Sequence, residues 1–136
     1  MNVVLDANVF VSGVFFSGIP GKILEAWRDG QLTLVTSPKI LEEYRRVGEY
    51  LRARHEDIDL QPLLSLAATA GLVVKDINLP DQICEDPDDD KFLACAIASG
   101  SKVIVSGDKH LLRVSGWRDI EVLSPRSFQE RYLRET

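Results

Sequence analysis

Two short runs of β-branched residues are each followed by an aspartate, and they limit the architectures that this chain can adopt. NVVL at 2–5 stops at Asp6, and KVIV at 102–105 is followed by a Ser-Gly turn and Asp108. Both runs are continuously apolar rather than alternating, which is typical of strands buried on both faces of a parallel sheet. The pattern therefore predicts a sheet that is covered by helices on both sides.

Helical segments alternate with the strands along the chain. Three further runs, at 32–35, 72–74 and 121–123, are weaker strand candidates. Ser-Pro and Asp-Pro pairs suit an N-cap and a first helical turn, and glycines suit helix ends. These signals place the helices at about 20–30, 38–54, 60–70, 87–99 and 125–132. Strands separated by helices of this length predict one three-layer α/β domain over 1–136, with a mostly parallel sheet of about five strands.

Composition sets outer limits on function. Hydrophobic residues make up 45% of the 136 positions, enough for a core without metal or disulfide support. The net charge of −5 argues against binding nucleic acid by bulk electrostatic attraction alone. Cys84 and Cys95 have neither disulfide nor metal-site spacing, and the N-terminus lacks a secretion signal, so a cytoplasmic protein with reduced thiols is expected. No apolar run approaches the length of a membrane helix, and no membrane association is expected.

Asp6 and Asp108 stand at the carboxyl ends of the two strongest strands. In an open parallel sheet these ends border the ligand-binding crevice, so both carboxylates are expected to face one cleft. The alternative interpretation is that each aspartate only caps the helix or turn that follows it.

A second acidic cluster, DPDDD at 86–90, leads into an almost wholly apolar helix. Helical spacing puts Asp86 and Asp89 on one face, whereas Asp88 and Asp90 project elsewhere. Acids near a helix N-terminus interact favourably with the helix dipole by about 0.3–1 kcal/mol each, which explains one or two of them. Four acids in five positions exceed that need, so the cluster is predicted to contribute to a functional site.

The helix after Pro38 carries two adjacent glutamates with different expected orientations. Its apolar stripe is centred on Tyr44, so Glu43 lies at the margin of the stripe and can reach the sheet edge. Glu42 points toward solvent, four residues before its expected ion-pair partner Arg46. Glu43 is therefore the candidate site residue, and an ordinary surface glutamate is the alternative.

Several carboxylates at one crevice repel one another unless a cation neutralises them. Oxygen ligands without thiolate or imidazole partners suit Mg²⁺ or Mn²⁺, and two such ions about 4 Å apart support phosphodiester hydrolysis. His55 and His110 lie in polar stretches and are interpreted as solvated. Basic residues near the acids are candidates for contacting a phosphate backbone or, equally, for a solvated surface. They are Lys39, Arg45, Arg46, Arg52, Arg54, Lys109, His110 and Arg113.

Four motifs, in order along the chain, resemble the PIN (PilT N-terminal) nuclease domain. They are LDANVFVSG at 5–13, SPKILEEY at 37–44, DPDDDKFLACAIASG at 86–100 and VIVSGDKHLL at 103–112. The likeness covers nearly the whole chain and is greatest to stand-alone bacterial and archaeal members described as toxins of toxin–antitoxin pairs. The resemblance implies a Rossmann-like sheet and an endoribonuclease that depends on Mg²⁺ or Mn²⁺.

The resemblance also implies roles for individual residues. The acids that match the family's catalytic and metal-binding positions are Asp6, Glu43, Asp89 and Asp108, with Asp86 as a further metal-binding acid common in this subgroup. Asn8 and Ser106 match polar positions that would hold Asp6 and a water on the metal, although hydrogen bonding within turns and caps is the alternative for both. Ala7 stands where Thr or Ser is frequent, which removes a hydroxyl near Asp6.

Two other functions are kept as alternatives. A phosphatase of the haloacid-dehalogenase type would use Asp6 as nucleophile, but it requires an aspartate two residues later, where this chain has Asn8. A non-catalytic RNA- or protein-binding module would keep the same acids without cutting. With RNA as the expected substrate, the resemblance suggests an antitoxin protein as partner and a homodimer or larger oligomer. The segment 48–60 matches no motif and is a candidate for substrate choice or partner binding.

Overall fold

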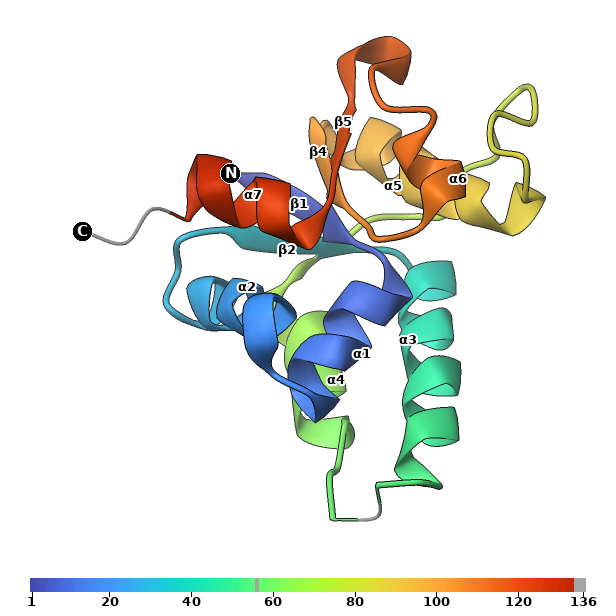
Figure 1. Cartoon of the computed structure of the whole chain (residues 1–136). Coiled ribbons are helices and arrows are strands. Elements are labelled where there is room, and N and C mark those ends of the chain that lie inside the picture. Colours follow the sequence, from blue (N-terminus) through green and yellow to red (C-terminus); the bar gives the residue numbers. More distant parts are fainter. Residues whose placement is uncertain (56, 134–136) are drawn as a thin grey trace.

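The computed structural model describes residues 1–55 and 57–133, which contain a five-stranded sheet (Figure 1). All neighbouring strands are parallel, in the order β3-β2-β1-β4-β5. The strands are β1 (Asn2–Leu5), β2 (Thr33–Thr36), β3 (Leu72–Val73), β4 (Val103–Val105) and β5 (Glu121–Leu123). The predicted α/β class and sheet are confirmed, and the described sheet is parallel throughout.

Helices cover both faces of this sheet (Figure 1). The α-helices are α1 (Ala7–Phe15), α2 (Gly18–Arg28), α3 (Pro38–Arg52), α4 (Gln61–Ala70), α5 (Asp90–Ser99), α6 (Lys109–Leu112) and α7 (Pro125–Tyr132), and the 3₁₀ turns are η1 (Pro87–Asp89) and η2 (Trp117–Asp119). The crossovers from β1 to β2 and on to β3 place α1 to α4 on one side of the sheet, and the crossover back to β4 places α5 on the other (Figure 1). Helix α7 returns to pack against α2 and β5.

The core is built from the central strands and from α5. Residues 3–5 of β1 and 103–105 of β4 are buried on both faces. Helix α5 is buried from Phe92 to Ala96 and packs against β1, β2 and β4. Continuous apolar runs therefore mark the elements enclosed on both sides, as the sequence predicts.

The predicted helix ends are present where the cap residues stand. Ser37 accepts a hydrogen bond from the Ile40 amide at 3.4 Å, and Ser124 accepts one from the Ser127 amide at 3.1 Å, each ahead of a proline in the first turn. Gly100 ends α5 with a left-handed φ of 74°. A side chain in that conformation would be strained, which is why glycine suits this position.

Helix α1 is an element that the sequence pattern does not predict. Its sequence, ANVFVSGVF, is apolar at most positions and rich in valine, so no 3.6-residue periodicity distinguishes it from a strand. Packing decides its conformation, because α1 lies closely against α2. A Cβ atom on Gly13 would lie 2.6 Å from Leu24 Cδ1 and 2.9 Å from the Pro20 carbonyl oxygen.

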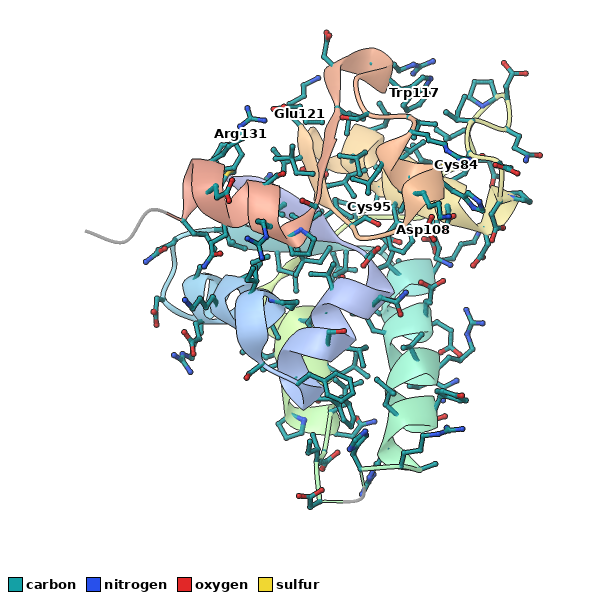
Figure 2. All side chains as sticks on the ribbon, viewed as in Figure 1. Cys84, Cys95, Asp108, Trp117, Glu121 and Arg131 are labelled. Carbon is teal, nitrogen blue, oxygen red and sulfur yellow. The ribbon has the colours of Figure 1, made fainter. Side chains whose placement is uncertain are left out.

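The two edge strands of the sheet have different surroundings. Strand β3 has only two residues, and both are exposed. At the other edge, Arg131 of α7 forms an ion pair with Glu121 of β5, with Nη1 2.6 Å from Oε2 (Figure 2). This pair ties the last helix to the last strand.

The segment 48–60 ends α3 and leads to α4; its residue 56 lies outside the described residues. Gly48 faces Leu60 so closely that a Cβ atom there would lie 2.0 Å from Leu60 Cδ2. The His55 ring packs edge-on against Phe15 and Phe16, at centroid distances of 6.0 and 5.3 Å. His55 is therefore only partly solvated, because its ring packs against two aromatic side chains.

Within the described residues, no single helix has the length and apolar character of a membrane span. Helices α1 and α2 have that length and apolar character only when they are taken together, and the two helices are bent by 94° relative to each other.

Candidate metal centre

The candidate site lies at the carboxyl ends of β1 and β4. The chain runs from β1 to β2 and β3 on one side and to β4 and β5 on the other, so this is the topological switch point at which α/β sheets bind ligands. Asp6 follows β1 and is 4% exposed, and its Oδ1 accepts a hydrogen bond from the Val9 amide at 2.8 Å. Its Oδ2 accepts a hydrogen bond from Ser106 Oγ at the end of β4. The residues after the two central strands are therefore in direct contact.

Ser106 also connects Asp6 to Asp108. The Ser106 hydroxyl oxygen accepts a hydrogen bond from the Asp108 amide at 2.9 Å, and Asp108 Oδ1 accepts one from the His110 amide at 2.7 Å. Asp6 thus caps α1 and Asp108 caps α6, as the alternative interpretation states. Capping does not separate the two aspartates, because Ser106 contacts both residues and the charge of Asp108 contributes to raising the pKa of Asp6.

Asn8 and Ser106, both expected to support the ligands, have different environments. Ser106 is fully buried and donates to Asp6. Asn8 is exposed in the first turn of α1, and among the described residues its side chain makes no hydrogen bond to Asp6. The predicted supporting role therefore has a structural counterpart at Ser106, whereas at Asn8 it stays a prediction.

The acidic segment forms a 3₁₀ turn before α5 rather than the first turn of one longer helix. Asp86 is exposed, and its Oδ1 accepts a hydrogen bond from the Asp88 amide at 3.0 Å. The carboxylate of Asp90 accepts two backbone amides of the preceding loop, from Ile83 at 3.0 Å and Cys84 at 2.7 Å. Asp90 therefore has a structural function, and metal binding by Asp86 stays a prediction.

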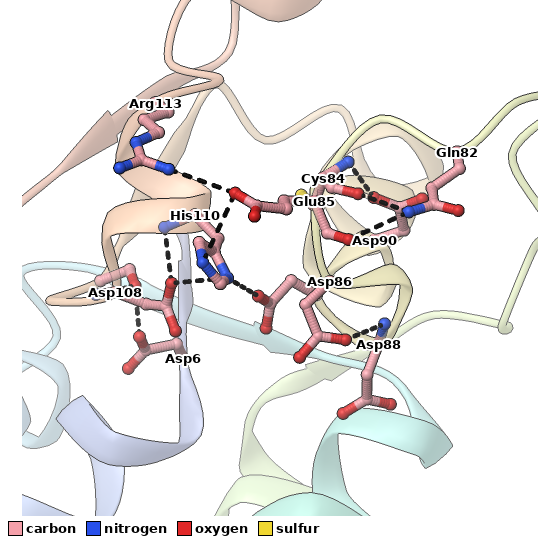
Figure 3. A network of polar contacts seen from close by, with 12 residues as sticks. Asp6, Gln82, Cys84, Glu85, Asp86, Asp88, Asp90, Asp108, His110 and Arg113 are labelled. Carbon is pink, nitrogen blue, oxygen red and sulfur yellow. Dashed lines mark hydrogen bonds and ion pairs between the residues drawn. The ribbon is translucent and has the colours of Figure 1, made fainter.

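Asp108 and His110 lie next to each other (Figure 3), and Asp89 is the third member of their cluster of potential metal ligands. One ligand atom from each of these three residues lies within 4.8 Å of the other two. His110 Nδ1 is 4.0 Å from Asp89 Oδ2 and 3.9 Å from Asp108 Oδ1, and Nε2 is 3.7 Å from Glu85 Oε2. The His110 side chain is 36% exposed and so is partly solvated, in line with the expectation, but it also lies among three carboxylates, which the sequence did not indicate.

Glu43 approaches the same edge of the sheet from α3. The next residue, Tyr44, is fully buried; its hydroxyl donates to the Leu5 carbonyl at 2.6 Å, and its ring stacks on Phe10 at 4.2 Å. These contacts fix α3 beside the end of β1. They leave the Glu43 side chain only 18% exposed, in agreement with its predicted place at the margin of the apolar stripe.

Glu42 points to solvent as predicted, but the predicted partner is wrong. It pairs with Arg45, three residues later, rather than with Arg46. Arg45 also contacts Glu49 at 2.7 Å, so its guanidinium is shared between two exposed acids. This part of the α3 surface is a solvated ion-pair network, which was the alternative to phosphate binding for this group of basic residues.

Lys91 is a residue of the site that the sequence pattern does not identify. Its side chain is 9% exposed, and its Nζ donates to Glu43 and, at 2.9 Å, to Asp88 Oδ2. The hydrogen bond from Lys91 is the main reason that the pKa of Asp88 is lowered. A lysine that directly follows three aspartates and opens an apolar helix is the signal that could have indicated this role.

Burial and mutual repulsion perturb two of the acids. Burial raises the pKa of Asp6, and the charges of Asp108 and Glu43 add to this, while hydrogen bonds from Ser106 and Val9 oppose it. Burial, followed by the charge of Asp108, raises the pKa of Asp89 to about 6. Both carboxylates are therefore less stable as anions here than they would be in water.

This set of donors fits a divalent cation. Asp89 Oδ2 is buried and, among the described residues, has no hydrogen-bond partner, so this oxygen is available to bind a cation. Asp6, Asp89 and Asp108 supply the hard oxygens that Mg²⁺ and Mn²⁺ prefer. A cation bound there would relieve the repulsion that raises the pKa of Asp6 and Asp89.

Comparisons with known proteins agree with this geometry. Residues 2–110 match the family described as PIN domain, and this range contains every acid of the candidate site. The chain is also similar to a protein of Methanocaldococcus jannaschii named "Uncharacterized protein MJ1680". The two are 33% identical over 117 residues, which cover 82% of this chain and 74% of that protein.

Proposed function

This chain belongs to the PIN domain family, whose members are typically metal-dependent nucleases, and on that premise we propose that it is an endoribonuclease that uses Mg²⁺ or Mn²⁺. The observation that carries the proposal is the buried Oδ2 of Asp89, which lies beside Asp108 and His110 and has no hydrogen-bond partner in the described part of the chain. An unpaired buried carboxylate oxygen destabilises a fold, so its presence at a ligand-binding edge favours a functional role.

Asp6, Asp89 and Asp108 are the residues that would hold the ion, with Glu43 and Asp86 at the margin of the set. A bound Mg²⁺ or Mn²⁺ would activate the attacking water and stabilise the leaving oxygen of the phosphodiester. Ser106 keeps the Asp6 carboxylate in one orientation.

Basic side chains next to the acids would position the RNA. Lys109 follows Asp108 directly and Arg113 lies just after α6; both are exposed, and Arg113 Nη1 is 3.2 Å from Glu85 Oε2. Ammonium and guanidinium groups suit phosphate oxygens, so Lys109, and Arg113 once released from Glu85, would contact the phosphates that flank the scissile bond. The net charge of −5 means that binding depends on these local contacts and on the metal rather than on bulk attraction.

We further propose that the protein acts as a toxin with an antitoxin protein as partner, in the form of a homodimer or larger oligomer. The support is the likeness of the four acidic motifs to stand-alone toxin members of the family.

We also propose a cytoplasmic location. Cys84 and Cys95 are buried, unpaired thiols, and burial raises the pKa of each to about 12, which suits a reducing compartment.

A cleavage assay tests the nuclease proposal. The purified protein is incubated with a mixed pool of single-stranded and structured RNA in Mn²⁺, in Mg²⁺ or in chelator, beside Asp6→Asn and Asp89→Asn. Asp29→Asn is the matched control, because Asp29 is an exposed residue at the end of α2. Cleavage is expected to need metal and to fall by at least about 100-fold in the two site variants but not in the control.

The same assay separates the alternatives. Folded Asp6→Asn and Asp89→Asn proteins that cut RNA as fast as the wild type would refute the proposal. A beryllofluoride adduct on Asp6 would instead support the phosphatase. Calorimetry without any Mg²⁺ or Mn²⁺ binding would support a non-catalytic binding module.

A further inference from the structure

Lys91 places a fixed positive charge inside the acidic site. It is the second residue of α5, and its side chain is 9% exposed, a degree of burial that lysine tolerates only when it is paired. Its Nζ reaches Glu43, which is 48 residues away in sequence, and Asp88, which is three residues away. The ammonium therefore joins α3 to the start of α5 at the edge of the cleft.

The acids of the site fall into two groups that differ in their partners. In the first, ligand atoms of Asp89, Asp108 and His110 lie within 4.8 Å of one another, and Asp89 Oδ2 has no hydrogen-bond partner among the described residues. In the second, the carboxylates of Glu43 and Asp88 are both bonded to Lys91. In the first group the nitrogen beside Asp89 Oδ2 is His110 Nδ1, at 4.0 Å and charged only when the ring is protonated, whereas the second group contains the ammonium of Lys91.

We propose that Lys91 is a positioning residue that takes the place of a second divalent cation, so that this site binds a single Mg²⁺ or Mn²⁺ ion. Sites with two ions hold them about 3.5–4 Å apart and need carboxylates on both. Here the carboxylate that a second ion would need, Glu43, is held by the ammonium of Lys91. Glu43 then acts through Lys91 and not as a metal ligand. The inference rests on the proposed function for the identity of the metal.

Metal stoichiometry tests this directly. Isothermal titration calorimetry with Mn²⁺ is expected to give one ion per chain for the wild type and two for Lys91→Met, which removes the charge and keeps the length of the side chain. Electron paramagnetic resonance should show isolated Mn²⁺ in the wild type and a coupled pair in Lys91→Met. Adding Glu43→Gln to Lys91→Met should return the count to one, because the second ion would lose its carboxylate.

Two controls separate the effect of the positive charge at position 91 from the effects of changing this side chain or of removing a lysine elsewhere. Lys91→Arg keeps a cation and should bind one ion, even if Lys91→Met proves too unstable to purify. Lys102→Met removes an exposed positive charge ahead of β4, at the opposite end of the strand from the acids, and should also bind one ion.

The outcomes distinguish this inference from the nuclease proposal. Two ions in the wild type or in Lys91→Arg, or one ion in Lys91→Met, would overturn the role of Lys91. A single ion in the wild type and two in Lys91→Met, without cleavage of any RNA, would support the role of Lys91 and refute the nuclease. Absence of metal binding in every variant would overturn both.

Discussion

Replacing Asp89 by asparagine is expected to stabilise the metal-free protein while it abolishes metal binding. The Asp89 side chain is 15% exposed, its Oδ2 has no hydrogen-bond partner among the described residues, and its pKa is raised to about 6. Between about pH 4 and pH 6 the folded protein therefore binds more protons at this site than the unfolded chain does. Because of this difference, the free energy of unfolding falls as the pH rises through that window and stays lower above it.

The magnitude follows from the pKa and from the position of Asp89 at the start of α5. A rise from 3.8 to about 6 corresponds to about 3 kcal/mol, and solvent screening of a side chain that is not fully enclosed reduces this to about 1–2 kcal/mol. Asparagine also loses the favourable interaction of a negative charge with the N-terminus of α5, about 0.3–1 kcal/mol. The net gain for Asp89→Asn at pH 7.5 is therefore about 1 kcal/mol, or about 4 °C in melting temperature.

Urea unfolding in chelator from pH 4 to pH 8 measures this effect, with Asp29→Asn as the exposed control. The advantage of Asp89→Asn should be absent near pH 4, where the wild-type carboxyl is protonated, and should reach its full size above pH 6. Addition of Mn²⁺ should reverse the order, because the ion stabilises only a protein that binds it. An Asp89→Asn protein that is less stable than the wild type at pH 7.5 in chelator, or a stability difference that does not change with pH, would show that the Asp89 carboxylate does not destabilise the metal-free fold.

Three further substitutions test other contacts. Ser106→Ala should raise the pKa of Asp6 still further, moving the acid limb of the cleavage–pH profile to higher pH, and should cost about 1–3 kcal/mol in urea unfolding; an unchanged profile would contradict the role of the hydroxyl. Tyr44→Phe leaves the buried Leu5 carbonyl without its 2.6 Å donor and should lower the free energy of unfolding by about 1–2 kcal/mol, so an unchanged urea midpoint would count against this bond. Gly100→Ala should lower the free energy of unfolding by about 1 kcal/mol. The whole effect would come from the left-handed φ of 74°, because a Cβ atom at this position meets no other atom within 4 Å; an unchanged stability would argue against that backbone conformation.

Residues whose chemistry is local could be placed from the sequence. Asp6 and Asp108 follow strands that are recognisable by their own apolar runs, and Ser37 and Gly100 stand at helix ends with their usual cap chemistry. Parallel strands bring their carboxyl ends to one edge, so the meeting of the two aspartates could be predicted without coordinates. Glu43 could be placed at the cleft margin because its helical stripe is clear.

Residues whose role depends on partners from other elements could not be placed in this way. Lys91 reaches Glu43 across 48 residues of sequence, and His110 of α6 lies 4.0 Å from Asp89 at the end of η1. Helix α1 could not be predicted for the same reason, since its uniform apolar sequence becomes helical through contact with α2 and α3.

Short segments of the sequence are enough to predict the class of fold and the candidate acids, because strand burial, helix caps and strand ends are properties of short segments. Which of these acids lie near a positive charge depends on the tertiary structure. Asp88 and Glu43 share the single ammonium of Lys91, Asp90 accepts two uncharged backbone amides, and Asp89 Oδ2 lies 4.0 Å from His110 Nδ1 without a hydrogen-bond partner among the described residues. Electrostatic partnership depends on distances of a few ångströms between groups far apart in sequence, and only the packing of α3, α5 and α6 at the end of the sheet sets those distances.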